Sequence, residues 1–137
     1  MTTLRRFLTL LILACATAAP LHAQKPADPK PLEAMLDKAL AAYNAGDSKA
    51  FYADYAKMMA SVATDQAYDM MFRSIYMKTH GKYVSRKLLK AESSVFEDTP
   101  LMVFESVFEK TKKVKISVNF MKEDGVYRIM QMQFAPM

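Results

Sequence analysis

The chain has 137 residues, a formal net charge of +5 and a hydrophobic fraction of 52%, which is the size and composition of a single globular domain. Its one cysteine, Cys15, excludes a disulfide framework within the chain and a thiolate metal cluster. Basic residues are mostly interleaved with acidic ones, and the dense run at 110–115 has no aromatic partners, so we expect no nucleic-acid partner.

Residues 1–23 are predicted to be a signal peptide. Arg5 and Arg6 precede an apolar run too short to span a bilayer, and small residues up to Ala23 are typical of a cleavage site. We therefore expect an exported protein, periplasmic or secreted, without a transmembrane segment after cleavage near Ala23. The run ending at Cys15 also resembles a lipoprotein signal, but Leu13 fits that pattern poorly, and free export is the favoured interpretation.

Three helices are predicted after a short lead-in. Residues 24–30 are polar and rich in lysine and proline, and we expect a disordered segment there. Pro31 can begin the first helix, whose apolar residues recur at steps of three and four as far as Tyr43, and Gly46 can end it.

The second and third helices have their own start and stop signals. Asp47 or Ser48 can cap the second helix, Thr64 can cap the third, and Gly81 can end it. The second is expected to bury Phe51, Tyr55, Met58, Met59 and Val62. The third is expected to bury Tyr68, Met71, Phe72, Ile75 and Tyr76.

Four strands are predicted from Tyr83 onward, where the apolar period changes from the helical value to two. Residues 101–110 form one of them, and residues 114–134 form a hairpin with Asp124 and Gly125 in a tight turn. Helices followed by antiparallel strands indicate an α+β fold, with three N-terminal helices on a four-stranded antiparallel sheet in one domain, residues 31–137.

A hairpin without irregularities would fix the register of the last two strands. It would pair Phe120 with Ile129, Val118 with Gln131 and Ile116 with Gln133. Gln131 and Gln133 would then face the helices together with Ile129. The opposite face would present an apolar surface, and we expect it to form a homodimer interface. The interface candidates are Phe104, Met130, Met132 and Phe134.

Four segments of the chain resemble nuclear-transport-factor-2-like domains. Ala41–Asp47 (AAYNAGD) and Phe51–Tyr55 (FYADY) are similar to the end of their first helix and to the start of the segment after it. Gly81–Tyr83 (GKY) and Gly125–Ile129 (GVYRI) are similar to the end of their third helix and to their final strand. The resemblance implies a cone-like fold, with a curved sheet wrapped round the helices, a pocket at the wide end and frequent dimerisation.

Tyrosines and methionines on the predicted helix faces suggest a soft apolar pocket with phenolic hydrogen bonds, the general form of a small-ligand site. Packing of the same side chains into the core is the alternative interpretation. The pocket candidates are Tyr43, Tyr55, Tyr68, Phe72, Tyr76, Gln131 and Gln133.

Catalytic and metal-ligating patterns are sparse. His22 leaves with the signal peptide, so His80 stands alone, and we expect no metal site and no cofactor. The acidic base of ketosteroid-isomerase-like members of the resembled family has no counterpart that the sequence identifies. We therefore expect a non-catalytic domain that binds an apolar or aromatic small molecule, or a protein partner. The alternatives are a pocket enzyme of the isomerase or hydrolase type and an envelope interaction module that uses its sheet face.

Overall fold

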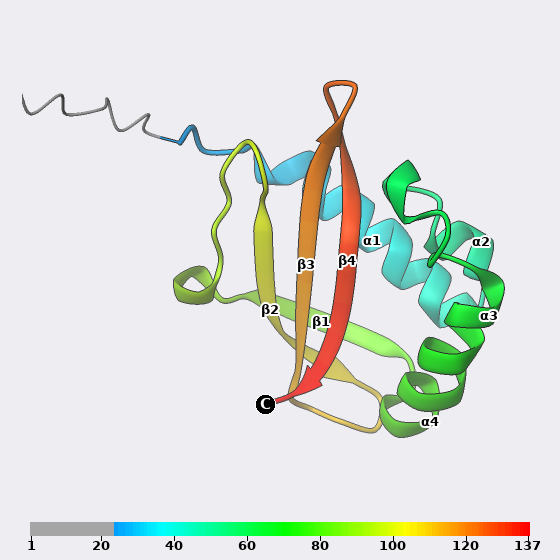
Figure 1. Ribbon diagram of the computed structural model, residues 1–137. Helices are drawn as coiled ribbons and strands as arrows, with labels where there is room; N and C mark the ends of the chain where they lie inside the picture. The colour runs from blue at the N-terminus through cyan, green and yellow to red at the C-terminus, as the bar shows by residue number, and fades with distance from the viewer. Residues whose placement is uncertain (1–23) are drawn as a thin grey trace, which may run out of the picture.

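The computed structural model describes residues 24–137; the expected signal peptide, its cleavage at Ala23 and Cys15 lie outside the described residues. The chain folds into an α+β structure in which helices cover one face of a four-stranded antiparallel sheet of order β1-β2-β3-β4 (Figure 1). The strands are β1 (Tyr83–Leu88), β2 (Leu101–Phe108), β3 (Val114–Glu123) and β4 (Val126–Pro136). All the α-helices precede the sheet, and only the short 3₁₀ turn η3 (Lys90–Glu92) lies between strands. Within 24–137, no helix combines the length and the apolar character that crossing a membrane requires.

Helix α1 (Pro29–Ala45) is the long helix of the first layer. Its cap is Asp28, whose side chain accepts a hydrogen bond from the Lys30 backbone N–H at 3.0 Å, so the helix begins two residues before the expected Pro31. Gly46 ends it at a φ of 69°, a left-handed conformation that glycine adopts without a Cβ clash. One face is buried, as the apolar spacing predicts, with Leu32, Leu36, Ala39, Leu40 and Tyr43.

The lead-in, residues 24–30, for which the sequence predicts a disordered segment, lies against the loop before β2. The Ala27 N–H donates to the Val95 carbonyl at 3.0 Å, and the Glu97 N–H donates to the Lys25 carbonyl at 2.8 Å. These two hydrogen bonds tie the segment to the loop before β2, where polar composition alone gave no sign of a partner strand.

The second predicted helix is only the single turn α2 (Ser48–Phe51), capped by Asp47 as expected. The chain then leaves the helical path and pairs with β4. The Ala56 N–H donates to the Ile129 carbonyl, and the Ile129 N–H donates to the Asp54 carbonyl, both at 2.8 Å. A short 3₁₀ turn, η1 (Lys57–Met59), follows.

This early exit overturns part of the predicted buried face of the second helix. Phe51 is buried, whereas Met58 and Val62 are exposed. Their apolar spacing matches a helix, but the hydrogen bonds to Ile129 hold the backbone in another conformation.

The third helix is continuous from Asp65 to His80, with Thr64 as its cap and Gly81 at its end. It consists of α3 (Asp65–Tyr68), a π-helical segment η2 (Asp69–Tyr76) and α4 (Met77–His80). A π-helix has more residues per turn than an α-helix. Positions four apart therefore stay on the face toward the sheet, and positions three apart turn away from it. Tyr68 and Phe72 are accordingly buried, while the expected core residues Met71 and Ile75 are exposed.

The last two strands form the predicted hairpin, but with one extra residue. Asp124 and Gly125 both have positive φ, 51° and 77°, as a primed turn requires. Phe120 faces Ile129 as expected, and Asn119 then faces Gln131, which leaves Met130 as a β-bulge.

The bulge reverses the faces of β4 from residue 131 onward, because side chains alternate with a period of two. Beyond it Val118 pairs with Met132 and Ile116 with Phe134, where the uninterrupted register placed Gln131 and Gln133. The prediction that the two glutamines face the helices is therefore wrong, and both are exposed.

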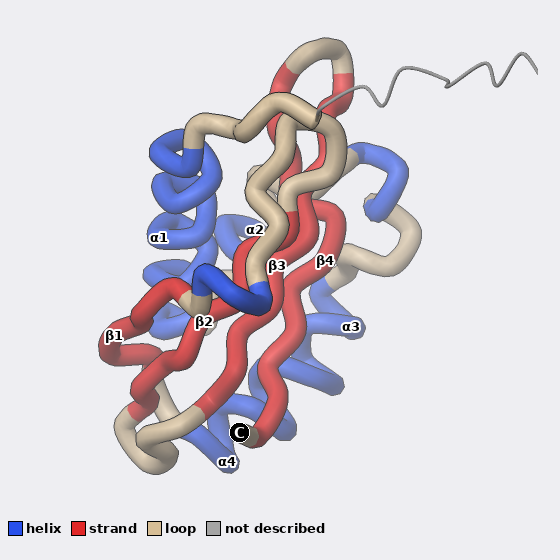
Figure 2. The backbone as a smooth tube through the Cα atoms, turned by 90° about the vertical axis from the view of Figure 1, so that its left-hand side faces the viewer, coloured by secondary structure: helices blue, strands red, loops and turns tan. Residues whose placement is uncertain are grey.

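The expected apolar sheet surface is the core instead. Met132, Phe134 and Phe104 are each at most 4% exposed and pack with Ile116, Val118 and Phe120. Figure 2 shows the opposite face of the sheet with only the short turn η3 drawn as a helix in front of the strands, and this face is largely polar. It carries Lys115, Ser117, Asn119, Gln131 and Gln133, none of which is buried.

The bulge predicts opposite consequences for substitutions at neighbouring positions of β4. Phe134→Ala should lower the free energy of unfolding by about 3–5 kcal/mol, because it removes a buried ring and leaves a cavity. Gln133→Ala should change it by no more than about 0.5 kcal/mol. Urea unfolding followed by circular dichroism measures both values. Equal losses, or a larger loss for Gln133→Ala, would contradict the observed register.

Candidate functional site

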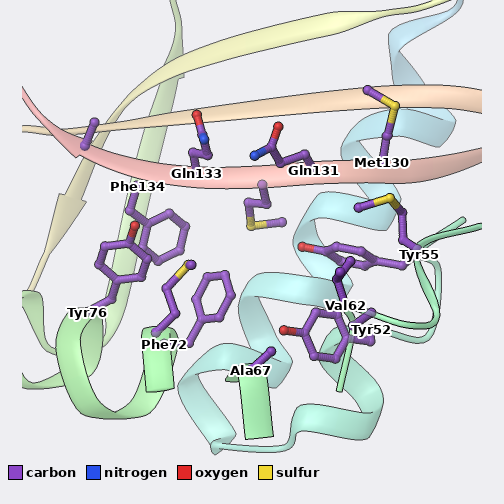
Figure 3. A pocket seen from close by; sticks show the side chains of 15 residues that line it. Tyr52, Tyr55, Val62, Ala67, Phe72, Tyr76, Met130, Gln131, Gln133 and Phe134 are labelled. Atoms are coloured by element: carbon purple, nitrogen blue, oxygen red, sulfur yellow. The ribbon is translucent and has the colours of Figure 1, made fainter. Parts of the chain in front are cut away.

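An open apolar groove of about 470 Å³ lies between β4 and the helical segment of residues 52–76 (Figure 3). This volume is within the range of small-molecule sites in proteins. Its lining comes from three parts of the chain: the turn after α2, the third helix and β4. The lining residues are Tyr52, Tyr55, Met59, Val62, Ala63, Ala67, Met71, Phe72, Tyr76, Met130, Gln131, Met132, Gln133, Phe134 and Ala135.

The groove exists because the chain touches β4 at one point and then moves away from it. The two hydrogen bonds to Ile129 fix the turn after α2 against the strand. The backbone then passes through η1 and returns only in the third helix. Small side chains at Ala63 and Ala67 fill little of the space that this path encloses.

The floor of the groove is an aromatic cluster. The Phe134 ring centroid lies 5.6 Å from that of Phe72 and 4.9 Å from that of Tyr76. The Phe72 contact is edge-to-face, with an interplanar angle of 84°, a favourable geometry for paired aromatic rings. The floor is therefore rigid, whereas the methionines of the walls can adapt their shape to an occupant.

Two tyrosines supply the polar groups at one end. The rings of Tyr52 and Tyr55 pack edge-to-face at 4.9 Å, and Figure 3 shows both hydroxyl oxygens directed toward the space beside Phe72. Among the hydrogen bonds of the described residues, none uses either hydroxyl. Burial raises the pKa of both phenols above the ordinary value of 10, so both remain protonated at neutral pH. They are hydrogen-bonding groups and not bases.

Five of the seven predicted pocket residues line this groove: Tyr55, Phe72, Tyr76, Gln131 and Gln133. The two glutamines do so differently from the prediction. Figure 3 shows their amide groups on the side of β4 away from the aromatic rings, so their backbone borders the groove while their amides face outward.

The other two predicted residues, Tyr43 and Tyr68, belong to the core and not to the groove. The Tyr43 hydroxyl donates to the Gly81 carbonyl at 2.9 Å, and the Tyr68 hydroxyl donates to the Tyr43 carbonyl at 3.4 Å. Both rings are at most 1% exposed. Core packing is the interpretation that holds for this pair.

The predicted interface residues are placed differently as well. Met130, Met132 and Phe134 line the groove, and Phe104 lies in the core beneath the guanidinium of Arg86. None of the four forms an exposed apolar sheet face, so the sheet surface expected to dimerise is absent from this part of the chain.

Sequence reasoning missed the contribution of Tyr52, Ala63 and Ala67. Tyr52 lies outside the apolar spacing predicted for a second helix, and the observed helix ends just before it. The one signal in the sequence was the excess of large apolar residues between 51 and 76, more than one helix face can bury.

The groove lining contains no Asp, Glu, His, Lys or Arg. Asp54, beside Tyr55 in the chain, is paired with Lys38 at 3.2 Å and with Arg128 at 3.7 Å. Across residues 24–137, no three His, Cys, Asp or Glu side chains converge as metal ligands would. The arrangement therefore offers apolar contact and phenolic hydrogen bonds as its chemistry.

No protein-family model matches the chain, and no curated protein matches its sequence.

His80 is a titratable group directly behind the groove. Its ring stacks on Tyr76 at 6.1 Å, and its Nδ1 lies 2.9 Å from the Thr111 hydroxyl oxygen. Burial lowers the pKa of His80 below its ordinary value of 6.5, because it disfavours the charged imidazole.

The lowered pKa predicts how stability depends on pH. Between the folded-state pKa and 6.5 the unfolded chain binds more protons than the folded one, so the free energy of unfolding falls as the pH drops through that window. His80→Gln should reduce this slope, which urea unfolding at a series of pH values measures. If the free energy of unfolding of His80→Gln falls below pH 6.5 as steeply as that of the unsubstituted protein, His80 is not the group responsible.

Proposed function

We propose that this domain is a non-catalytic binding protein that takes an apolar or aromatic small molecule into the groove beside β4. The observation that carries the proposal is a preformed opening of about 470 Å³ whose floor and walls are apolar. Ligand sites in proteins have this form, a largely apolar cleft with a few polar groups that fix orientation.

The lining defines the chemistry of the ligand. Phe72, Tyr76 and Phe134 offer ring faces and edges to a flat apolar group. The hydroxyls of Tyr52 and Tyr55 favour a ligand with a hydrogen-bond acceptor or donor at one end. The absence of charged side chains from the lining favours a neutral molecule, because a charge buried there would lack a partner.

Binding without catalysis is favoured over an isomerase or hydrolase activity by the side chains at hand. A general base works best with a pKa near neutral pH, and the titratable groups of the lining are tyrosines. An interaction module acting through the sheet face is less favoured, because that face is polar.

We also propose that the protein is exported and that it is a divergent nuclear-transport-factor-2-like domain. The N-terminal sequence pattern supports export. The Asn44–Asp47 turn after α1 and the Gly125–Ile129 stretch entering the last strand support the family, because both occupy the positions that the resemblance implies.

Met71→Asp should weaken binding of the neutral fluorescent probe N-phenyl-1-naphthylamine at least tenfold, because it places a charge on the groove wall. Probe fluorescence titrated with protein measures the dissociation constant.

The matched control is Met70→Asp, its neighbour on η2, which is 64% exposed and does not line the groove. Probe affinity in this variant should stay within about twofold of the unsubstituted protein. Equal weakening by the two substitutions, or no probe binding to the unsubstituted protein, would refute the proposed site.

A further inference from the structure

Strand β4 is an edge of the sheet, so one side of its backbone has no neighbouring strand. The chain itself covers the beginning of this edge. Asp54 and Ala56 make two backbone hydrogen bonds with Ile129, as an added strand running parallel to β4 would. The coverage ends there, because the backbone turns into η1 and moves away.

The next outward-facing backbone groups belong to Met132 and Phe134. The backbone N–H and C=O groups of Ile129 point away from β3, toward the turn after α2. The bulge keeps Met130 and Gln131 opposite Asn119, so residues 132 and 134 are the next whose backbone groups point away from β3. Pro136 continues this phase, and a proline is tolerated where the missing N–H would point away from the sheet. Among the hydrogen bonds between described segments, none reaches the backbone of Met132 or Phe134.

The open edge and the groove are adjacent. The side chains of Met132 and Phe134 line the groove, and the backbone of the same two residues faces outward. Beyond the groove walls, further apolar side chains stand exposed on η1 and η2, at Met58, Met70 and Ile75. A surface that combines unpaired strand backbone with an apolar trough matches the requirements of strand addition.

We propose that the occupant of this surface is an extended peptide segment of a partner protein, which adds to β4 at Met132–Phe134 and places alternate apolar side chains in the groove. This inference goes beyond the proposed function: it uses the same groove, but the occupant is a segment of polypeptide and not a small molecule. A strand has the required pattern because its side chains alternate between two faces while its N–H and C=O groups alternate between two edges.

A second copy of the chain fits this edge poorly. Antiparallel pairing of two β4 strands about a two-fold axis normal to the sheet keeps both helical layers on the same face. The segment of residues 59–76 of each copy would then occupy the space that the other copy needs. A lone extended segment carries no such layer, so it fits where a folded domain is obstructed.

Amide hydrogen exchange measured by NMR tests the proposal on the unsubstituted protein. In the free protein, the N–H groups of Met132 and Phe134 should exchange fast, while those of Gln131 and Gln133, which face β3, should exchange slowly. The probes are end-blocked heptapeptides with Val, Leu or Phe at alternate positions and Thr between them. A binding peptide should slow exchange at residues 132 and 134 at least tenfold.

The matched control peptides keep all side chains and replace some of the peptide's backbone N–H donors with N-methyl groups. Two isomers of the best peptide carry N-methyl groups on alternate residues, one isomer in each phase. One isomer should lose affinity at least tenfold and the other should keep it, because only one phase of N–H groups points at β4. Equal affinity of both isomers for the protein would overturn strand addition.

The fluorescent probe separates the peptide proposal from the small-ligand function. If N-phenyl-1-naphthylamine binds in the groove but no heptapeptide slows exchange at residues 132 and 134, the peptide proposal is wrong and the small-ligand function stands. If neither the probe nor a peptide binds, both are wrong. If residues 132 and 134 are already protected in the free protein and sedimentation shows a dimer, the occupant is a second copy and the peptide proposal is overturned.

Discussion

The single extra residue at Met130 is the feature on which the rest of the structure depends. By placing two residues of β4 opposite Asn119, it turns Met132 and Phe134 toward the helices and sends Gln131 and Gln133 to solvent. Without the bulge, two amides would lie against an aromatic cluster, where each unpaired polar group costs about 1–3 kcal/mol. The apolar core and the groove floor are thus made by the same irregularity in one strand.

The groove follows from a second departure from regular structure, the early end of α2. A longer second helix would have covered β4 along its length and closed the space. Instead, the backbone forms two hydrogen bonds with Ile129 and leaves the rest of the edge open. Side chains for apolar binding and backbone groups for strand pairing therefore lie within a few residues of each other, and this is why the proposed ligand chemistry includes both.

Local signals in the sequence predicted most of the fold. Asp47 and Thr64 cap helices, Gly46 and Gly81 end them, and Asp124–Gly125 forms the hairpin turn, because each of these depends on neighbouring residues alone. The faces of β4 could not be predicted in the same way. Its apolar side chains change phase along the strand, from Tyr127 and Ile129 to Met132 and Phe134, whereas the two-residue turn alone implies an uninterrupted ladder. A bulge reconciles the two, and its position depends on contacts with distant helices.

The central claim is tested most directly by nuclear Overhauser contacts between α-protons across the β3–β4 pair. Facing residues of an antiparallel pair that exchange no hydrogen bonds bring their α-carbons to about 4.5 Å, close enough for a strong α-proton contact. The bulge predicts such contacts between Ile116 and Phe134 and between Val118 and Met132. Contacts from Ile116 to Gln133 and from Val118 to Gln131 would show an uninterrupted hairpin, and would contradict both the groove floor and the open edge inferred from it.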